Sequence, residues 1–331
     1  MHEDWGRLAG RWAGIRSEHI DVRGTQVHTL RAGDDVDGPC QLLVHGLGGS
    51  ASNWLDVIPG LAHRGPVLAP DLPGFGRTEP PSDRAARVGA NARFLAALLD
   101  RVGWGRVEVH GNSMGGMLSV LFASRETERV TSLLLAAPAL TSSRRDIPQL
   151  SKATFLRFGP FFIPLVGRRL LERAYERMSP EELYEDMAAY IHADPDRVSS
   201  ELAEVTLDNI RFGRETPWRL PGFALATTSV VWAVTGRQAL ERAIREVAAP
   251  TLIVWGDQDR LVGRPVIDRA RRLRPDWELA ELPGVGHAAM VEVPERYLEV
   301  VVPWLDARLA SGPSGPAPEP ATGELRVQDR A

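Results

Sequence analysis

The chain has 331 residues, a mass of 36.3 kDa, 44% hydrophobic and 25% charged residues, and a formal net charge of −4. This balance is typical of a folded globular protein, and it excludes wholesale disorder, a fibrous repeat and a strongly basic surface for nucleic acid. The lone cysteine, Cys40, excludes an internal disulfide and a Cys-rich metal site. Neither a signal peptide nor an apolar window of ~20 residues is present, so we expect a cytoplasmic protein without a transmembrane segment.

The first predicted element is an N-terminal arm over residues 1–19. Trp5, Leu8, Trp12 and Ile15 follow one another at spacings of three and four, which predicts a short amphipathic helix packed by one face on the body. Apolar residues then alternate over residues 20–30 around a turn, which predicts a hairpin.

Short apolar runs that end in turn residues come next, and helix-length segments such as residues 86–102 separate them. Fully apolar strands alternating with helices indicate a mostly parallel sheet covered on both faces, an α/β architecture. The runs occupy residues 41–44, 66–69, 107–109, 133–136, 251–255 and 278–282.

One long stretch, residues 140–247, contains helical patterns and few strand-like runs, so we interpret it as a helical cap inserted into the sheet domain. The core then consists of residues 20–139 and 248–310 in an eight-stranded type of sheet. Residues 311–331, rich in Pro, Gly, Ala and Glu, are predicted to be disordered. The predicted cap helices are residues 170–178, 181–192, 202–212 and 238–247.

The strongest chemical motif is Gly-Asn-Ser-Met-Gly-Gly at residues 111–116, between an apolar strand and a predicted helix. This Gly-x-Ser-x-Gly pattern is typical of a nucleophile elbow, in which a strained turn exposes the serine oxygen, here that of Ser113. Because a serine hydroxyl is a weak nucleophile at neutral pH, it needs a base and a group that orients the base.

Among the eight histidines, His287 is the candidate base. It follows a predicted strand in the loop Leu-Pro-Gly-Val-Gly-His at residues 282–287, where open α/β sheets gather their active sites. The other seven are expected to lie on the surface or to pack as structure, with His45 shaping the loop that it begins. The orienting acid is expected after residues 251–255, where Asp257 and Asp259 compete and spacing alone does not choose between them.

A glycine-rich loop, His-Gly-Leu-Gly-Gly at residues 45–49, follows another apolar strand. Loops of this type donate one N–H to an oxyanion hole, so we expect the backbone N–H groups of Leu47 and Met114 to face the developing negative charge. The loop has neither of the glycine patterns that bind nucleotide phosphates. No cofactor and no metal are expected.

Taken together, these motifs and the segment Asp-Leu-Pro-Gly-Phe-Gly-Arg-Thr at residues 71–78 resemble the α/β-hydrolase fold superfamily, in its capped serine esterase and lipase-like branch. The resemblance covers about residues 20–310. It implies that the acid is the Asp closing Gly-x-x-Asp, here Asp259. A serine rather than an aspartate at the elbow implies acyl transfer through Ser113.

The main hypothesis is therefore a carboxylesterase or lipase-like hydrolase acting on a small apolar ester. Carbon–carbon hydrolases of ring-fission products look similar at residues 111–116, but they usually carry Gly-Pro-Gly in the first loop, where this chain has Gly46-Leu47-Gly48-Gly49. Such a hydrolase, a thioesterase or an acyltransferase is the alternative. Large apolar residues at 155–166 are either an acyl-binding wall or ordinary packing, and the oligomeric state stays open.

Overall fold

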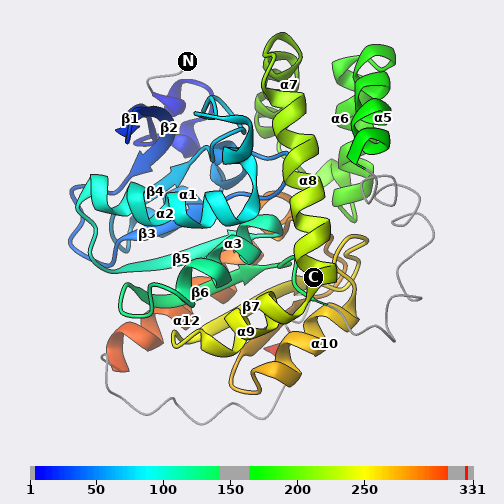
Figure 1. Cartoon of the computed structure of the whole chain (residues 1–331). Coiled ribbons are helices and arrows are strands. Elements are labelled where there is room, and N and C mark those ends of the chain that lie inside the picture. Colours follow the sequence, from blue (N-terminus) through cyan, green and yellow to red (C-terminus); the bar gives the residue numbers. More distant parts are fainter. Residues whose placement is uncertain (1–3, 142–163, 312–324, 327–331) are drawn as a thin grey trace.

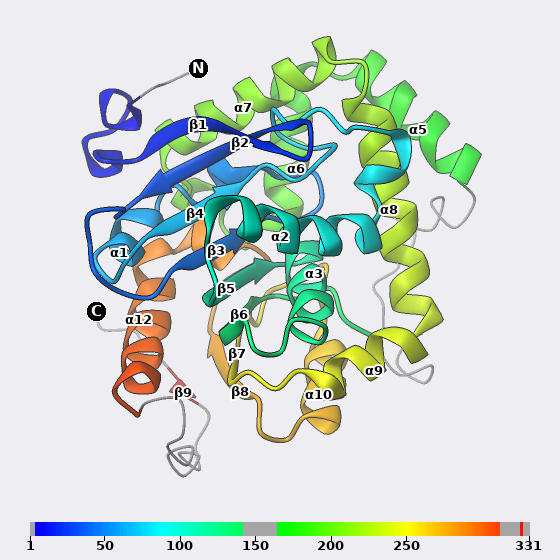
Figure 2. The same cartoon turned by 60° about the vertical axis from the view of Figure 1, so that its left-hand side comes forward.

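The computed structural model describes residues 4–141, 164–311 and 325–326. Their strands form one sheet in the order β1-β2-β4-β3-β5-β6-β7-β8-β9 (Figures 1 and 2). β2 pairs antiparallel with β1 and β4, and every other neighbouring pair is parallel. The predicted mostly parallel α/β sheet is confirmed. The strands are β1 Arg16–Val22, β2 Thr25–Ala32, β3 Gln41–Val44, β4 Val67–Pro70, β5 Val107–Asn112, β6 Val130–Ala136, β7 Thr251–Gly256, β8 Glu278–Leu282 and β9 Leu325–Arg326.

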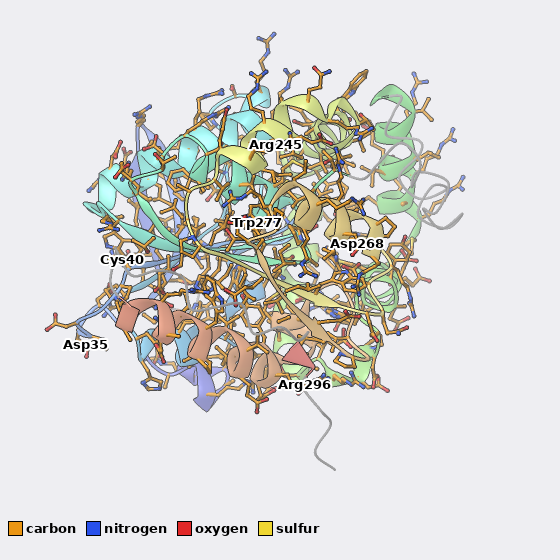
Figure 3. All side chains as sticks on the ribbon, turned by 90° about the horizontal axis from the view of Figure 1, so that it is seen from below. Asp35, Cys40, Arg245, Asp268, Trp277 and Arg296 are labelled. Carbon is orange, nitrogen blue, oxygen red and sulfur yellow. The ribbon has the colours of Figure 1, made fainter. Side chains whose placement is uncertain are left out.

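Helices cover both faces of the sheet because successive strand residues point to opposite sides. In β3, Leu42 and Val44 belong to one buried cluster and Leu43 to the other. Figure 3 shows Arg245 of α9 and Asp268 of α10 on one side of the sheet and Arg296 of α12 on the other. One layer contains α2 Val88–Val102, α3 Met114–Ala123, α9 Gln238–Glu246 and α10 Arg264–Leu273; the other contains α1 Ile58–Ala62, α11 Ala289–Glu292 and α12 Pro294–Ser311.

A helical insertion between β6 and β7 lies beyond the sheet, as predicted (Figure 1). A capping box begins α6, Pro180–Ile191: the Ser179 hydroxyl accepts from the N–H of Glu182 at 3.0 Å, and the Glu182 carboxylate accepts from the N–H of Ser179 at 2.6 Å. The described helices of this cap are α5 Pro164–Arg177, α6 Pro180–Ile191, α7 Ser200–Glu215 and α8 Arg219–Gly236.

The longest cap helix, α8, was not among the predicted helices. Its residues are apolar on nearly all sides, so it lacks the one-sided helical period on which the prediction depends. No helix among the described residues combines the length and apolarity needed to span a membrane.

Helix α9 lies within the predicted cap range, residues 140–247, yet it packs on the sheet domain. Its buried Leu240, Ala243 and Ile244 belong to the same core cluster as the buried residues of α3.

The N-terminal arm departs from the prediction. Instead of one amphipathic α-helix, it forms two 3₁₀ turns, Trp5–Arg7 and Gly10–Trp12. The chain folds back on itself, so that a Cβ on Gly6 would lie 2.9 Å from Cα of Ala13. The two tryptophans are nevertheless buried. Within the predicted tail, Leu325–Arg326 form the strand β9 beside β8 rather than disordered chain, and most of the other tail residues lie outside the described residues.

Candidate active site

Ser113 stands at the sharp turn between β5 and α3. Its φ of 53° and ψ of −114° lie in a region that non-glycine residues rarely adopt, which marks the strain expected of a nucleophile elbow. The flanking glycines are required by close backbone contacts. A Cβ on Gly111 would lie 2.6 Å from the carbonyl oxygen of Gly115, and a Cβ on Gly115 would lie 2.1 Å from that of Val44. The sequence motif therefore has the local geometry that it predicts.

His287 and Asp259 form a hydrogen-bonded pair beyond the ends of β7 and β8. Nδ1 of His287 lies 2.8 Å from Oδ2 of Asp259, and the side chains are only 5% and 0% exposed. The other carboxylate oxygen accepts the N–H groups of Leu261 at 2.7 Å and Val262 at 2.9 Å. Asp257 instead accepts the N–H of Gly284 at 2.7 Å. The geometry thus brings Asp259, and not Asp257, to the histidine.

Asn112 links the elbow to the histidine loop, a role that the sequence analysis missed. Its side-chain amide donates to the carbonyl oxygens of Ala136 at 3.1 Å and His287 at 3.3 Å. Two signals could have singled it out: its position next to Ser113, and an Asn in a strand, where this residue type is uncommon. Because Ser113 directly follows Asn112, the bond to the His287 carbonyl oxygen holds the elbow near the histidine loop.

The loop at residues 45–49 lies against the elbow, since a Cβ on Gly46 would be 3.3 Å from Cβ of Ser113. Among the described groups, the backbone N–H of Leu47 and that of Met114 donate to no hydrogen-bond acceptor. Two free donors beside a serine are what an oxyanion hole requires. Their arrangement is consistent with the prediction for these two residues.

His45 holds this loop in shape, as expected. Its Nδ1 lies 2.7 Å from the carbonyl oxygen of Gly46, and its Nε2 accepts the N–H of Leu72 at 3.1 Å. Burial lowers the pKa of His45 to about 4, so the ring is neutral at pH 7. Both ring nitrogens of His45 therefore form hydrogen bonds with the backbone, which leaves the ring no part in proton transfer at Ser113.

A second buried network fixes the loop at residues 71–78. Asp71 accepts from the N–H of Ala51 at 2.7 Å and that of Arg77 at 2.8 Å, and its Oδ2 lies 2.7 Å from Nδ1 of His28. Burial would by itself raise the pKa of Asp71, but His28, His45 and the N–H of Ala51 together lower it to about 2. The carboxylate is therefore ionised and stabilises two loops at once.

The cap contacts the loop at residues 45–49 and the 3₁₀ turn that follows it, Ala51–Trp54. Phe223 of α8 covers Gly48, where an added Cβ would meet the ring at 2.9 Å, and Asn209 of α7 donates to the hydroxyl of Ser52 at 3.0 Å. The predicted apolar wall at residues 155–166 lies almost entirely outside the described residues; Val166, its last member, is 42% exposed. No set of three or more His, Cys, Asp or Glu residues in the described chain could hold a metal ion.

Arg219, at the start of α8, is a cation that the sequence analysis did not single out. Its Nη1 donates to the carbonyl oxygen of Gly76 at 3.0 Å, and it has no carboxylate partner among the described residues. Burial lowers the pKa of Arg219. The lowered pKa of His45 is caused mainly by burial of that ring, and the nearby charge of Arg219 contributes to it. A positive charge that forms no ion pair with a described carboxylate, although the ionised Asp71 is near enough to act on it, therefore lies between the cap and the loops around the elbow.

A strained serine after β5, followed by an acid after β7 and a histidine after β8, is the chain order and topology of an α/β hydrolase. A family model described as the alpha/beta hydrolase fold matches residues 42–294. The chain therefore belongs to the α/β-hydrolase fold family.

The relatives that the chain resembles include both a dienedioate hydrolase and a lipase. The chain is 29% identical over 300 residues to 2-hydroxy-6-oxononadienedioate/2-hydroxy-6-oxononatrienedioate hydrolase 1 of Dechloromonas aromatica, covering 88% of this chain and 93% of that protein. It is 28% identical over 261 residues to Lipase 3 of Moraxella sp., covering 78% and 75%. The solved structure of 2-hydroxy-6-oxo-6-phenylhexa-2,4-dienoate hydrolase from Rhodococcus sp. superposes with a TM-score of 0.70 at 22% identity, covering 89% of this chain and 99% of that one.

Proposed function

We propose that the protein is a serine hydrolase in which Ser113 attacks a carbonyl carbon. His287 takes the serine proton, Asp259 holds the imidazole in the required tautomer, and the N–H groups of Leu47 and Met114 stabilise the oxyanion. The observation that carries this proposal is the buried pair of His287 and Asp259 at 2.8 Å, linked through Asn112 to the strained elbow. Water then hydrolyses the acyl-enzyme.

For the bond, the proposal is a carbon–carbon bond next to a ketone in a carboxylate-bearing substrate. The dienedioate and dienoate hydrolases among the relatives act on compounds whose names contain a ketone but no ester, so hydrolysis must break a carbon–carbon bond. Addition of Ser113 to the ketone and cleavage would leave the electron pair on the departing carbon, which takes up a proton from His287. The acyl group stays on the serine oxygen until water releases it as a carboxylic acid.

The position of Arg219 supports the proposal that the substrate carries a carboxylate. Burial disfavours the charged form of Arg219 by more than the nearby Asp71 carboxylate compensates, and a bound anion would offset part of that cost. Because Arg219 contacts the loop at residues 71–78 and its helix covers Gly48, an anionic group held there would lie beside the elbow. A neutral ester would gain nothing from this charge.

The second candidate is the hydrolysis of a carboxylic ester. It is supported by the similarity to Lipase 3 and by the first loop, which has Leu47-Gly48 where ring-fission hydrolases usually have Pro-Gly. The same three residues would act, with an alcohol as the leaving group, which takes its proton from His287.

A direct substrate comparison separates the two candidates. Purified protein is assayed with 2-hydroxy-6-oxo-6-phenylhexa-2,4-dienoate, followed by loss of the dienoate absorbance, and with p-nitrophenyl esters of increasing chain length. We expect kcat/KM to be about 100-fold higher for the dienoate, a difference of about 2.7 kcal/mol in transition-state binding. The reverse preference would establish the ester hydrolase. The Ser113→Ala variant should lose nearly all activity on both substrates while keeping its fold.

A further inference from the structure

A second buried carboxylate lies beside the histidine loop and takes no part in the scheme above. Glu292, at the end of α11, is 1% exposed. Its Oε2 accepts the N–H of Gly286 at 2.9 Å and that of Ala193 at 3.0 Å, and its Oε1 accepts the N–H of Asp194 at 3.2 Å. One of these donors precedes His287 directly, and the other two belong to the segment that follows α6 in the cap.

The same cap segment holds the histidine loop by its backbone. The N–H of His287 donates to the carbonyl oxygen of Ile191 at 2.7 Å, and Arg197 donates through Nη1 to that of Gly284 at 2.8 Å. A Cβ on Gly286 would lie 2.5 Å from the Ile191 oxygen and 2.9 Å from Oε2 of Glu292. The loop is therefore packed tightly between the cap and this carboxylate.

Two side chains of the cap face Glu292. Nδ1 of His192 lies 3.8 Å from Oε2, and Nη1 of Arg197 lies 3.5 Å from Oε1. Burial would by itself raise the pKa of Glu292, but His192 and the three N–H donors lower it below its usual value. An anion with three backbone donors is a strong and directional anchor.

We propose that Glu292 is the positioning residue that fixes the backbone of His287 and joins it to the cap. It acts on the loop, whereas Asp259 acts on the imidazole, so the two acids divide the placement of one side chain. The inference rests on the proposed role of His287 as the base. It also gives the cap a part in catalysis, because two of the three donors to Glu292 come from residues 193 and 194 of the inserted segment.

The test is the Glu292→Gln variant, with Glu295→Gln as the matched control on the exposed side of the next helix. The glutamine offers one acceptor and one NH₂ group, so at least one backbone N–H faces a donor. We expect kcat to fall about ten-fold or more with KM within about two-fold, because a small displacement of a catalytic group slows chemistry without weakening binding. The downfield proton resonance of the His287–Asp259 hydrogen bond should shift in this variant and stay unchanged in Glu295→Gln.

A wild-type kcat in folded Glu292→Gln would overturn the proposal, as would a variant that loses thermal stability but keeps its kcat and its downfield resonance. If Glu292→Gln does not fold, Arg197→Gln provides the answer. Arg197 is 42% exposed, and the substitution removes its bond to Gly284, its contact with Glu292 and an exposed ion pair with Asp194 at 3.3 Å. A decrease in kcat of about three-fold or more is expected there, and an unchanged kcat refutes the coupling. His287→Gln tests the proposed function separately: if it remains active, His287 is not the base.

Discussion

Oδ2 of Asp259 lies 2.8 Å from Nδ1 of His287, while the other oxygen of this carboxylate accepts two backbone N–H groups. The carboxylate of Asp259 is therefore held in place by the backbone of its own turn, independently of its contact with the ring. Its free lone pairs point to Nδ1, which fixes the tautomer that leaves Nε2 available as a base.

Replacing Asp259 with Asn should lower kcat about 10³- to 10⁴-fold, because the amide offers Nδ1 a donor and favours the wrong tautomer. Asp257→Asn is the matched control, since Asp257 is exposed and contacts only the backbone of Gly284. Steady-state kinetics on the preferred substrate measure both variants. If Asp257→Asn is the slower enzyme, the assignment of the acid is wrong.

Much of the site followed from local sequence signals. A glycine-flanked serine between a strand and a helix predicts a tight turn, and Ser113 has the strained backbone that such a turn imposes. Spacing alone could not rank the two carboxylates after β7, because they are two residues apart in one turn, and the preference for Asp259 came from the family resemblance. In the structure, the position of β8, which carries His287 to the same edge of the sheet, brings Asp259 rather than Asp257 to the histidine.

Features set by long-range contacts could not be predicted from the sequence. The arm at residues 4–15 has helical spacing, but it forms 3₁₀ turns because its tryptophans pack on a body whose surface the sequence does not display. Likewise, Glu292 and Arg219 look like ordinary charged residues in the sequence. Their importance arises from burial and from partners that lie 99 and 143 residues away in the chain.

Gly115→Ala should destabilise the elbow. The added methyl group would lie 2.1 Å from the carbonyl oxygen of Val44, and a backbone atom of the central sheet cannot move aside cheaply. We expect the unfolding free energy to fall by about 1–3 kcal/mol and activity to be lost. Gly105→Ala is the control, since a Cβ there meets nothing within 4 Å; urea unfolding of both variants should show a loss only for Gly115→Ala.

Asp71 should make stability depend on acidity. Because folding lowers its pKa from 3.8 to about 2, the folded state binds fewer protons, so the stabilisation is complete above pH 4 to 5 and is lost as the pH falls through about 2. Asp71→Asn should lower the unfolding free energy by about 2 kcal/mol at pH 6 and by about 1 kcal/mol at pH 3. Urea titrations at both pH values measure the difference.

Asp35→Asn is the control for this titration, because Asp35 projects from the surface (Figure 3). Its unfolding free energy should match that of the wild type at both pH values. An Asp71→Asn deficit that is equally large at pH 6 and pH 3 would mean that lost hydrogen-bond geometry, rather than charge, accounts for the effect.

Arg219→Gln should weaken the reaction of a charged substrate much more than that of a neutral one. If the guanidinium pairs with a substrate carboxylate, its removal should raise KM for the dienoate about ten-fold or more and change kcat/KM for a neutral p-nitrophenyl ester less than about three-fold. Arg211→Gln, an exposed arginine of α7 that pairs with Glu181, is the control and should leave both substrates unaffected. Equal losses on the two substrates would assign Arg219 to the support of the loop at Gly76, since its hydrogen bond to that carbonyl oxygen is the contact that both reactions share.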